Sequence, residues 1–184
     1  MNRSEAFLLL NQHLQNANLI KHSLAVEAGM KKLANYFGQN EEEWGLAGLL
    51  HDIDYELTKD DLQRHSLVGA EMVRDSGFSN EVAEAIKTHN QVHGYPPKSL
   101  MAKALFCIDP LTGLIVAAAL VLPSRRLKDL TVESVENRFR EKSFARGADR
   151  EVISKCQEYL QLSCHDFIAL VLLAMQEIDQ TLGL

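Results

Sequence analysis

The sequence predicts an all-α protein, and three observations support this. Nearly every segment repeats apolar residues at spacings of three and four, the period of a helix that buries one face. No run of alternating apolar and polar residues is long enough to predict a strand. Glycine, proline and capping residues separate the periodic segments, at FGQN (37–40), DSGFSN (75–80) and HGYPP (93–97).

Taken in chain order, the periodicity predicts helices over about 3–15, 18–38, 41–51, 60–76, 79–91, 98–122, 131–141, 149–161 and 163–182. FGQN divides the second helix from the third, DSGFSN the fourth from the fifth, and HGYPP precedes the sixth. Pro110 falls inside the sixth, where we expect it to kink or restart the helix because it removes a backbone donor. Since no long linker or repeat is present, we expect a single domain over 1–184, with a core at about 18–125 and a basic and C-terminal helical extension at about 126–184.

Length and composition narrow the class of protein. The chain has 184 residues, is 46% hydrophobic and carries a formal charge of −6, which argues against a general nucleic-acid binder. The apolar run near the N-terminus is too short for a secretory signal, and the run at 114–122 is less than half a membrane span. We therefore expect a cytoplasmic protein without a membrane partner, and the sequence does not predict its oligomeric state.

The three cysteines, Cys107, Cys156 and Cys164, are odd in number and form no CxxC pair. Neither a disulfide framework nor a thiolate zinc site is indicated. We expect reduced cysteines in the core.

One segment differs from the rest in charge. Residues 123–150 carry eight Lys or Arg against five Asp or Glu, a local charge of +3 that leaves −9 on the rest of the chain. Two interpretations remain open: a solvated helical face, or a lobe that faces a phosphate group.

Five of the predicted helices each carry a histidine or aspartate on the face that packs into the core. These residues are His22, His51, His65, His89 and Asp109. A buried carboxylate such as that of Asp109 needs a cation or several donors to offset its desolvation. The same periodicity test also selects His13 and His165, which we do not expect to be ligands, so the pattern alone does not identify a site.

As a set, histidine nitrogens and carboxylate oxygens without a thiolate suit a divalent Fe, Mn, Co, Ni or Zn ion. Adjacent ligands such as His51 and Asp52 can hold one metal or bridge two.

The order His22, then His51–Asp52, then Asp109 resembles the HD superfamily of metal-dependent phosphohydrolases, with its pattern H…HD…D. His65 and His89 are similar to the two further histidines of its binuclear members. The resemblance covers about 18–125, and the ending DPLTGLIVAAALVLPSRRL (109–127) is similar to a poorly characterised bacterial branch of predicted HD hydrolases. It implies a helical bundle in which all six residues bind one or two divalent metals, with Asp52 bridging the two if two are present.

A second His–Asp pair, His165–Asp166, has no ligands downstream of it and begins the last predicted helix, so we interpret it as a capping and surface pair. The role of Asp54 stays open: it orients a ligand histidine, helps to move protons, or faces solvent beyond the helix end. Glu56 is equally uncertain, and His93 is expected to be a loop residue.

The resemblance implies hydrolysis of a small phosphorylated metabolite, with a nucleotide as the favoured class, by attack of a metal-activated water on phosphorus. Asp52 and Asp54 are the candidate catalytic residues. The candidate substrate-binding residues, the last four of which would hold phosphates, are Thr112, Ser124, Arg125, Arg126, Lys142 and Arg146. Two alternatives are an HD-type di-iron oxygenase and a non-catalytic ligand-binding or signalling domain, and the presence of all six candidate ligands counts against the second.

Overall fold

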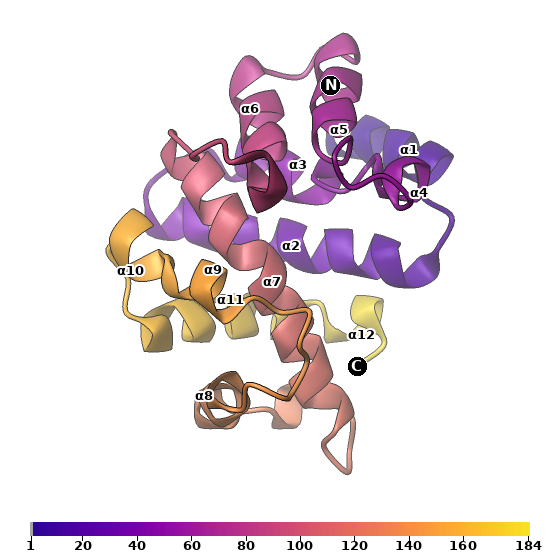
Figure 1. The fold of residues 1–184 in the computed structure, drawn as a ribbon. Helices are drawn as coiled ribbons and strands as arrows, with labels where there is room; N and C mark the ends of the chain where they lie inside the picture. Colours follow the sequence, from indigo (N-terminus) through magenta and orange to yellow (C-terminus); the bar gives the residue numbers. More distant parts are fainter. Residues whose placement is uncertain (1) are drawn as a thin grey trace.

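The computed structural model describes residues 2–184, and these residues form helices without any strand, which confirms the all-α prediction. Figure 1 shows the arrangement. The helices are α1 (Arg3–His13), α2 (Ala17–Tyr36), α3 (Glu41–Leu50), α4 (Tyr55–Thr58), α5 (Leu67–Asp75), α6 (Asn80–His89), the 3₁₀ turn η1 (Gln91–His93), α7 (Leu100–Leu120), η2 (Leu127–Asp129), α8 (Val132–Arg140), α9 (Arg150–Ser154), α10 (Cys156–Tyr159), α11 (Cys164–Glu177) and α12 (Asp179–Leu182).

Side-chain caps begin α3 and α6 at the capping residues that separate the predicted helices. Asn40 accepts from the Glu43 amide at the start of α3, and Ser79 accepts from the Val82 amide at the start of α6. Each cap satisfies an amide that has no partner within its own helix. Gly38, in the turn before Asn40, has φ of +64°, a conformation that side chains with a Cβ rarely adopt.

Three predicted helices differ from the observed ones. The helix expected over 60–76 begins only at Leu67, because residues 62–66 form turns and Ser66 has φ of +70°, which a right-handed helix does not allow. The segment expected as 149–161 is divided into α9 and α10, and the segment expected as 163–182 into α11 and α12.

Helix α7 continues through Pro110 from Leu100 to Leu120, so the expected restart at the proline is wrong. Proline costs its helix one backbone hydrogen bond, but α7 is packed on most sides and its neighbours hold it in place. By length and composition α7 could cross a membrane, yet 61% of its most apolar window is buried within this fold, as in the core helix of a globular protein.

The core is built around α2, with α3 packed along it and α7 crossing it (Figure 1). Two glycines allow these close approaches. A Cβ on Gly48 of α3 would lie 2.9 Å from the carbonyl oxygen of Val26 in α2, and a Cβ on Gly29 of α2 would collide with the side chain of Ile108 in α7. The crossing brings the middle of α2, the end of α3 and the middle of α7 together.

The cysteines are free, and Cys107 and Cys156 are buried as expected. Cys164 is half-buried, and its sulfur lies 3.8 Å from that of Cys156. Burial raises the pKa of the Cys107 thiol to about 12, so this thiol is protonated at neutral pH.

Candidate metal centre

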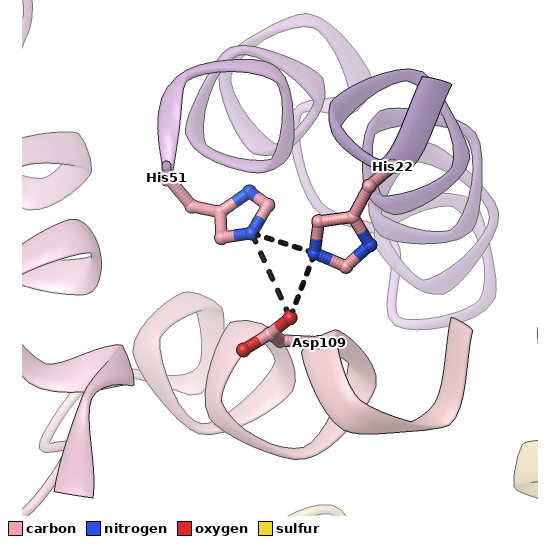
Figure 2. Close-up of side chains that lie close together, drawn as sticks. All are labelled: His22, His51 and Asp109. Carbon is pink, nitrogen blue, oxygen red and sulfur yellow. Dashed lines mark hydrogen bonds and ion pairs between the residues drawn. The ribbon is translucent and has the colours of Figure 1, made fainter. Parts of the chain in front are cut away.

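Three residues from different helices meet where α2, α3 and α7 approach one another (Figure 2). His22 lies on α2, His51 caps the C-terminal end of α3, and Asp109 lies on α7. The His22 Nε2 atom is 2.9 Å from Asp109 Oδ1 and 3.2 Å from His51 Nε2. His51 Nε2 is 3.7 Å from the same Asp109 oxygen. The three atoms form a triangle that is small enough to surround one ion.

Asp52 lies between this triangle and a second group of ligands. Its Oδ2 atom is 3.4 Å from His51 Nε2 and 3.8 Å from His22 Nε2. Its Oδ1 atom is 3.3 Å from His65 Nε2 and 3.5 Å from His89 Nε2. The two carboxylate oxygens therefore face two different sets of histidines.

The Nδ1 atom of each of the four histidines has an acceptor. His51 Nδ1 donates to the Gly48 carbonyl at 2.8 Å, and His89 Nδ1 donates to the Ile86 carbonyl at 2.6 Å. His65 Nδ1 donates to Asp54 Oδ1 at 3.0 Å. Nδ1 of His22 lies 3.2 Å from the Thr112 hydroxyl, whose own proton goes to the Asp109 carbonyl, so the hydroxyl accepts. In a neutral histidine these bonds place the proton on Nδ1, so Nε2 carries a lone pair that is directed into the cluster.

These tautomers make the cluster fit a cation. With Nδ1 protonated in both residues, the Nε2 lone pairs of His22 and His51 face each other at 3.2 Å and repel unless positive charge lies between them. The donor set of four imidazole nitrogens and two carboxylates, without a thiolate, suits Fe, Mn, Co, Ni or Zn. The cluster is thus able to hold divalent metal.

The charges within the cluster lead to the same conclusion. Burial would raise the pKa of Asp52 and of Asp109, but the adjacent histidines hold both pKa values well below their usual range. Burial would lower the pKa of His51, but the carboxyl groups of Asp52 and Asp109 raise it well above its usual value. The pKa of His65 is raised to about 9, because Asp52 and Asp54 outweigh its burial. Two ionised carboxylates thus draw positive charge into the site.

Asp54 is fully buried, so the interpretation in which it faces solvent is wrong. Its Oδ1 atom accepts from His65, and its Oδ2 atom accepts from the backbone amides of Ser66 and Gly69, each at 2.9 Å. A Cβ on Gly69 would lie only 3.1 Å from this carboxyl group, so glycine leaves room for it. All three contacts serve to hold His65 in place.

His65 precedes α5 in the structure, whereas the sequence places it within a helix. Ser66 turns the chain at this point with its positive φ. Two hydrogen bonds hold this conformation: the Ser66 amide donates to Asp54, and the Ser66 hydroxyl donates to the Lys87 carbonyl. His93, expected as a loop residue, ends the 3₁₀ turn η1 and donates from Nε2 to the His65 carbonyl at 2.7 Å. Contacts from three segments therefore fix the position of His65, which does not lie within a helix.

Thr112 was predicted to donate to substrate, and its position contradicts this. The residue is fully buried, and its hydroxyl is engaged by the Asp109 carbonyl and by His22. Thr112 therefore positions His22, a role that the sequence did not reveal.

The remaining polar candidates lie outside the cluster. Glu56 accepts from the amides of Gln15 and Asn16 at 2.9 and 2.7 Å and so anchors the loop before α2. His165 is exposed and contacts Glu136, while Asp166 accepts from Ser163 at the start of α11. The interpretation of the second His–Asp pair as a capping and surface pair is confirmed.

The basic segment begins beyond the end of α7 and returns at its other end to η1, where Gln91 donates to Asp149 at 3.0 Å. Its predicted phosphate ligands are all exposed, and none makes an ion pair with another described residue; they are Arg125, Arg126, Lys142 and Arg146. A helix rises about 1.5 Å per residue, so Leu120 at the end of α7 lies about 16 Å from Asp109 along the helix axis. Ser124 and Arg125 follow this end of the helix. Arg150, by contrast, donates to six backbone carbonyls between Arg138 and Ala148 and holds the loop after α8.

Among its described residues, the cluster is most exposed at His22 and Asp109. The side chains of His22 and Asp109 are 23% and 30% exposed, whereas those of His51, His89 and His65 are 0%, 2% and 9% exposed. A substrate can therefore reach the site at the edge formed by His22 and Asp109.

Comparison with known proteins is consistent with this geometry. The model of the HD domain family matches residues 19–161. Ribonuclease Y of Oleidesulfovibrio alaskensis is 31% identical over 140 residues, which cover 73% of this chain and 26% of the relative. Ribonuclease Y of Geobacter sulfurreducens is 30% identical over 138 residues, with 73% and 26% covered. The chain thus spans about a quarter of the length of the curated relatives that it matches.

Proposed function

The chain belongs to the HD domain family, and on this premise we propose that it hydrolyses a small phosphorylated metabolite, with a nucleotide as the favoured class. The family indicates the superfamily of metal-dependent phosphohydrolases. The substrate class, the roles of individual residues and the number of metals are parts of the proposal.

The observation that carries the proposal is the convergence of four histidine Nε2 atoms on the two oxygens of Asp52. A structural role would require only that each buried imidazole has a partner, and the Nδ1 bonds already provide one. The orientation of every Nε2 toward one carboxylate is explained by metal binding.

Divalent metal held there would activate water and neutralise charge on the phosphoryl oxygens. The chain's own groups prepare the site for this. The acceptors at each Nδ1 fix the tautomer of the ligand histidines, and Asp54 orients His65 through a buried carboxylate. The buried His65 and His89 exclude water from the inner half, and the open edge at His22 and Asp109 lets a phosphate group approach.

The basic residues contribute to the proposal as distal phosphate ligands. Since Arg125 and Arg126 lie beyond the end of α7, they reach only a substrate that extends along this helix from Asp109. Arg126 lies near Asp179 of α12, whose pKa is lowered first by Lys128 and also by Arg126. Lys142 and Arg146 belong to the loop held by Arg150, and Ser124 adds a neutral donor.

The test combines metal analysis of the purified protein with a hydrolysis screen of phosphorylated metabolites. Asp52→Asn keeps the side-chain size but removes the charge, so it should lower metal content and reduce hydrolysis by about 100-fold or more. His165→Ala, which changes the second His–Asp pair, is the matched control and should change neither quantity. Normal metal content and activity in Asp52→Asn would refute the proposal.

A second candidate substrate is RNA, because the relatives at 30–31% identity are named ribonuclease Y. The charge of −6 argues against a general nucleic-acid surface. Cleavage of a single-stranded RNA oligonucleotide by the metal-loaded protein, without hydrolysis of mononucleotides, would favour this candidate.

The di-iron oxygenase and the non-catalytic domain are separated from hydrolysis by measurement. Oxygen consumption by iron-loaded protein with an organophosphonate or a small polyol would favour the oxygenase. Metal binding without turnover of any phosphorylated compound would favour a ligand-binding domain.

A further inference from the structure

A groove begins at His22 and extends away from the metal cluster between α2 and α7. Its volume is about 460 Å³, within the range of small-molecule sites. Three parts of the chain line it: Asn18, Lys21 and His22 on α2; Gly113, Val116 and Leu120 on α7; and residues 182–184 at and after the end of α12.

The groove continues the ligand-bearing faces of both helices. Gly113, Val116 and Leu120 follow Asp109 by four, seven and eleven residues, so they share its side of α7. Asn18 precedes His22 by four residues and lies on the same side of α2. His22 both borders the open edge of the cluster and lines the groove, so a group bound at this edge could extend into the groove along the same side of α7.

The chemistry of the walls is specific. Val116, Leu120 and Leu182 supply apolar surface, and Gly113 leaves a gap in the wall, since a Cβ there would meet nothing within 4 Å. Among the described residues, the charged groups that line the groove are the Lys21 side chain and the main-chain carboxylate of Leu184. The walls of the groove therefore favour a group with apolar faces, while the anion of the substrate would stay at the metal cluster.

We propose that this groove binds the organic part of the substrate and that this part carries a flat apolar face, such as an aromatic or heteroaromatic ring. The inference rests on the proposed phosphohydrolase function and narrows its substrate to phosphate esters with a bulky apolar or planar group. Small polar phosphates, such as those of short polyols, would fill the metal edge and leave the groove empty.

The test measures binding, so that it does not depend on turnover. The manganese-loaded protein is titrated calorimetrically with two phosphonates, 1-naphthylmethylphosphonate and methylphosphonate, whose carbon–phosphorus bonds a phosphohydrolase does not cleave. We expect the naphthyl compound to bind at least about tenfold more tightly, since even one methylene group in an apolar pocket discriminates by about 10-fold to 200-fold.

The variant Gly113→Phe places an aromatic ring in the groove at an exposed helical position with open space around it. The ratio of the two dissociation constants should then approach one, and Gly113→Ala should reduce this ratio only in part. Leu173→Phe, at an exposed position on α11, is the control and should keep the tenfold ratio. A melting curve verifies that each variant is folded, and Gly113→Leu replaces Gly113→Phe if the latter is not.

Each outcome decides a separate question. A tenfold preference that disappears in Gly113→Phe supports the groove. Equal binding of both phosphonates, or a preference that survives in Gly113→Phe, overturns the inference and leaves the hydrolase proposal intact. Failure of both phosphonates to bind the metal-loaded protein contradicts recognition of phosphate and overturns both.

Discussion

The substitution Asp54→Asn tests whether a fully buried acid controls the tautomer of His65. An asparagine oxygen can still accept from the amides of Ser66 and Gly69, but the amide nitrogen then faces His65 Nδ1. Two donors cannot bond each other, so His65 must carry its proton on Nε2, the atom directed at Asp52. The residue would lose its lone pair toward the metal.

The size of the effect follows from the contacts. A hydrogen bond to a charged group contributes about 1 kcal/mol more than one between neutral groups, so the three bonds to Asp54 together lose up to about 3 kcal/mol. For a chain of this length that loss lowers Tm by about 10 °C. Substituting a residue that orients a ligand histidine typically lowers metal affinity by about 10-fold to 100-fold.

The loss of bound metal should be confined to one side of the cluster. In a two-metal site, metal held by Asp52, His65 and His89 should be lost, whereas metal held by His22, His51 and Asp109 should be retained. Manganese bound per chain after equilibrium dialysis, together with the ¹⁵N shifts of the His65 ring, measures both effects.

Glu56→Gln is the matched control, because Glu56 also accepts from two backbone amides but contacts no histidine. It should lower Tm modestly and leave the metal content unchanged. The reasoning would be refuted by Asp54→Asn protein that keeps its full metal content and the wild-type His65 shifts, or by equal metal loss in both variants.

Three further predictions concern protons, packing and charge. In the metal-free protein the pKa of His65 is about 9, so the residue is protonated at neutral pH; manganese affinity should therefore rise with pH up to about 9, with proton release visible by calorimetry in two buffers. Gly48→Ala should destabilise the fold by about 2 kcal/mol, because its Cβ would lie 2.9 Å from the Val26 carbonyl, whereas Gly113→Ala, with open space, should raise Tm. If the basic segment binds phosphate, Arg126→Glu should raise KM severalfold and leave Tm unchanged. Arg140→Glu is the control, because Arg140 is already paired with Glu136, and it should leave KM unchanged. Equal KM values in the wild type and Arg126→Glu would favour a solvated helical face.

Helical periodicity found most of the candidate site because the ligands are attached to regular elements. His22, His89 and Asp109 lie on the core-facing sides of their helices, as their spacing predicts. His51 and His89 share a further pattern, since each donates to the carbonyl three residues earlier at the end of its helix. A histidine that ends an apolar helix is therefore a usable signal for a side chain whose Nδ1 bonds its own helix and whose Nε2 is directed into the core.

The contacts that the sequence could not predict depend on the tertiary structure. The burial of Asp54 depends on amides 12 and 15 residues away, and the role of Thr112 depends on a histidine 90 residues away. The position of His65 depends on a left-handed serine, and no periodicity rule places such a residue. The helix over 60–76 was predicted too long for the same reason.

If each half of the cluster holds an ion, as in a two-metal site, the unequal exposure of the two halves sets the lifetime of each ion. An ion between His22, His51 and Asp109 borders solvent, so water or a chelator can enter its coordination sphere and remove it without disturbing the fold. An ion between Asp52, His65 and His89 is enclosed by side chains no more than 10% exposed and leaves only when the surrounding chain opens. Brief treatment with a chelator should therefore remove the outer ion first and leave a half-loaded protein. Exchange of the inner ion would then report the rate of local opening around α5 and α6.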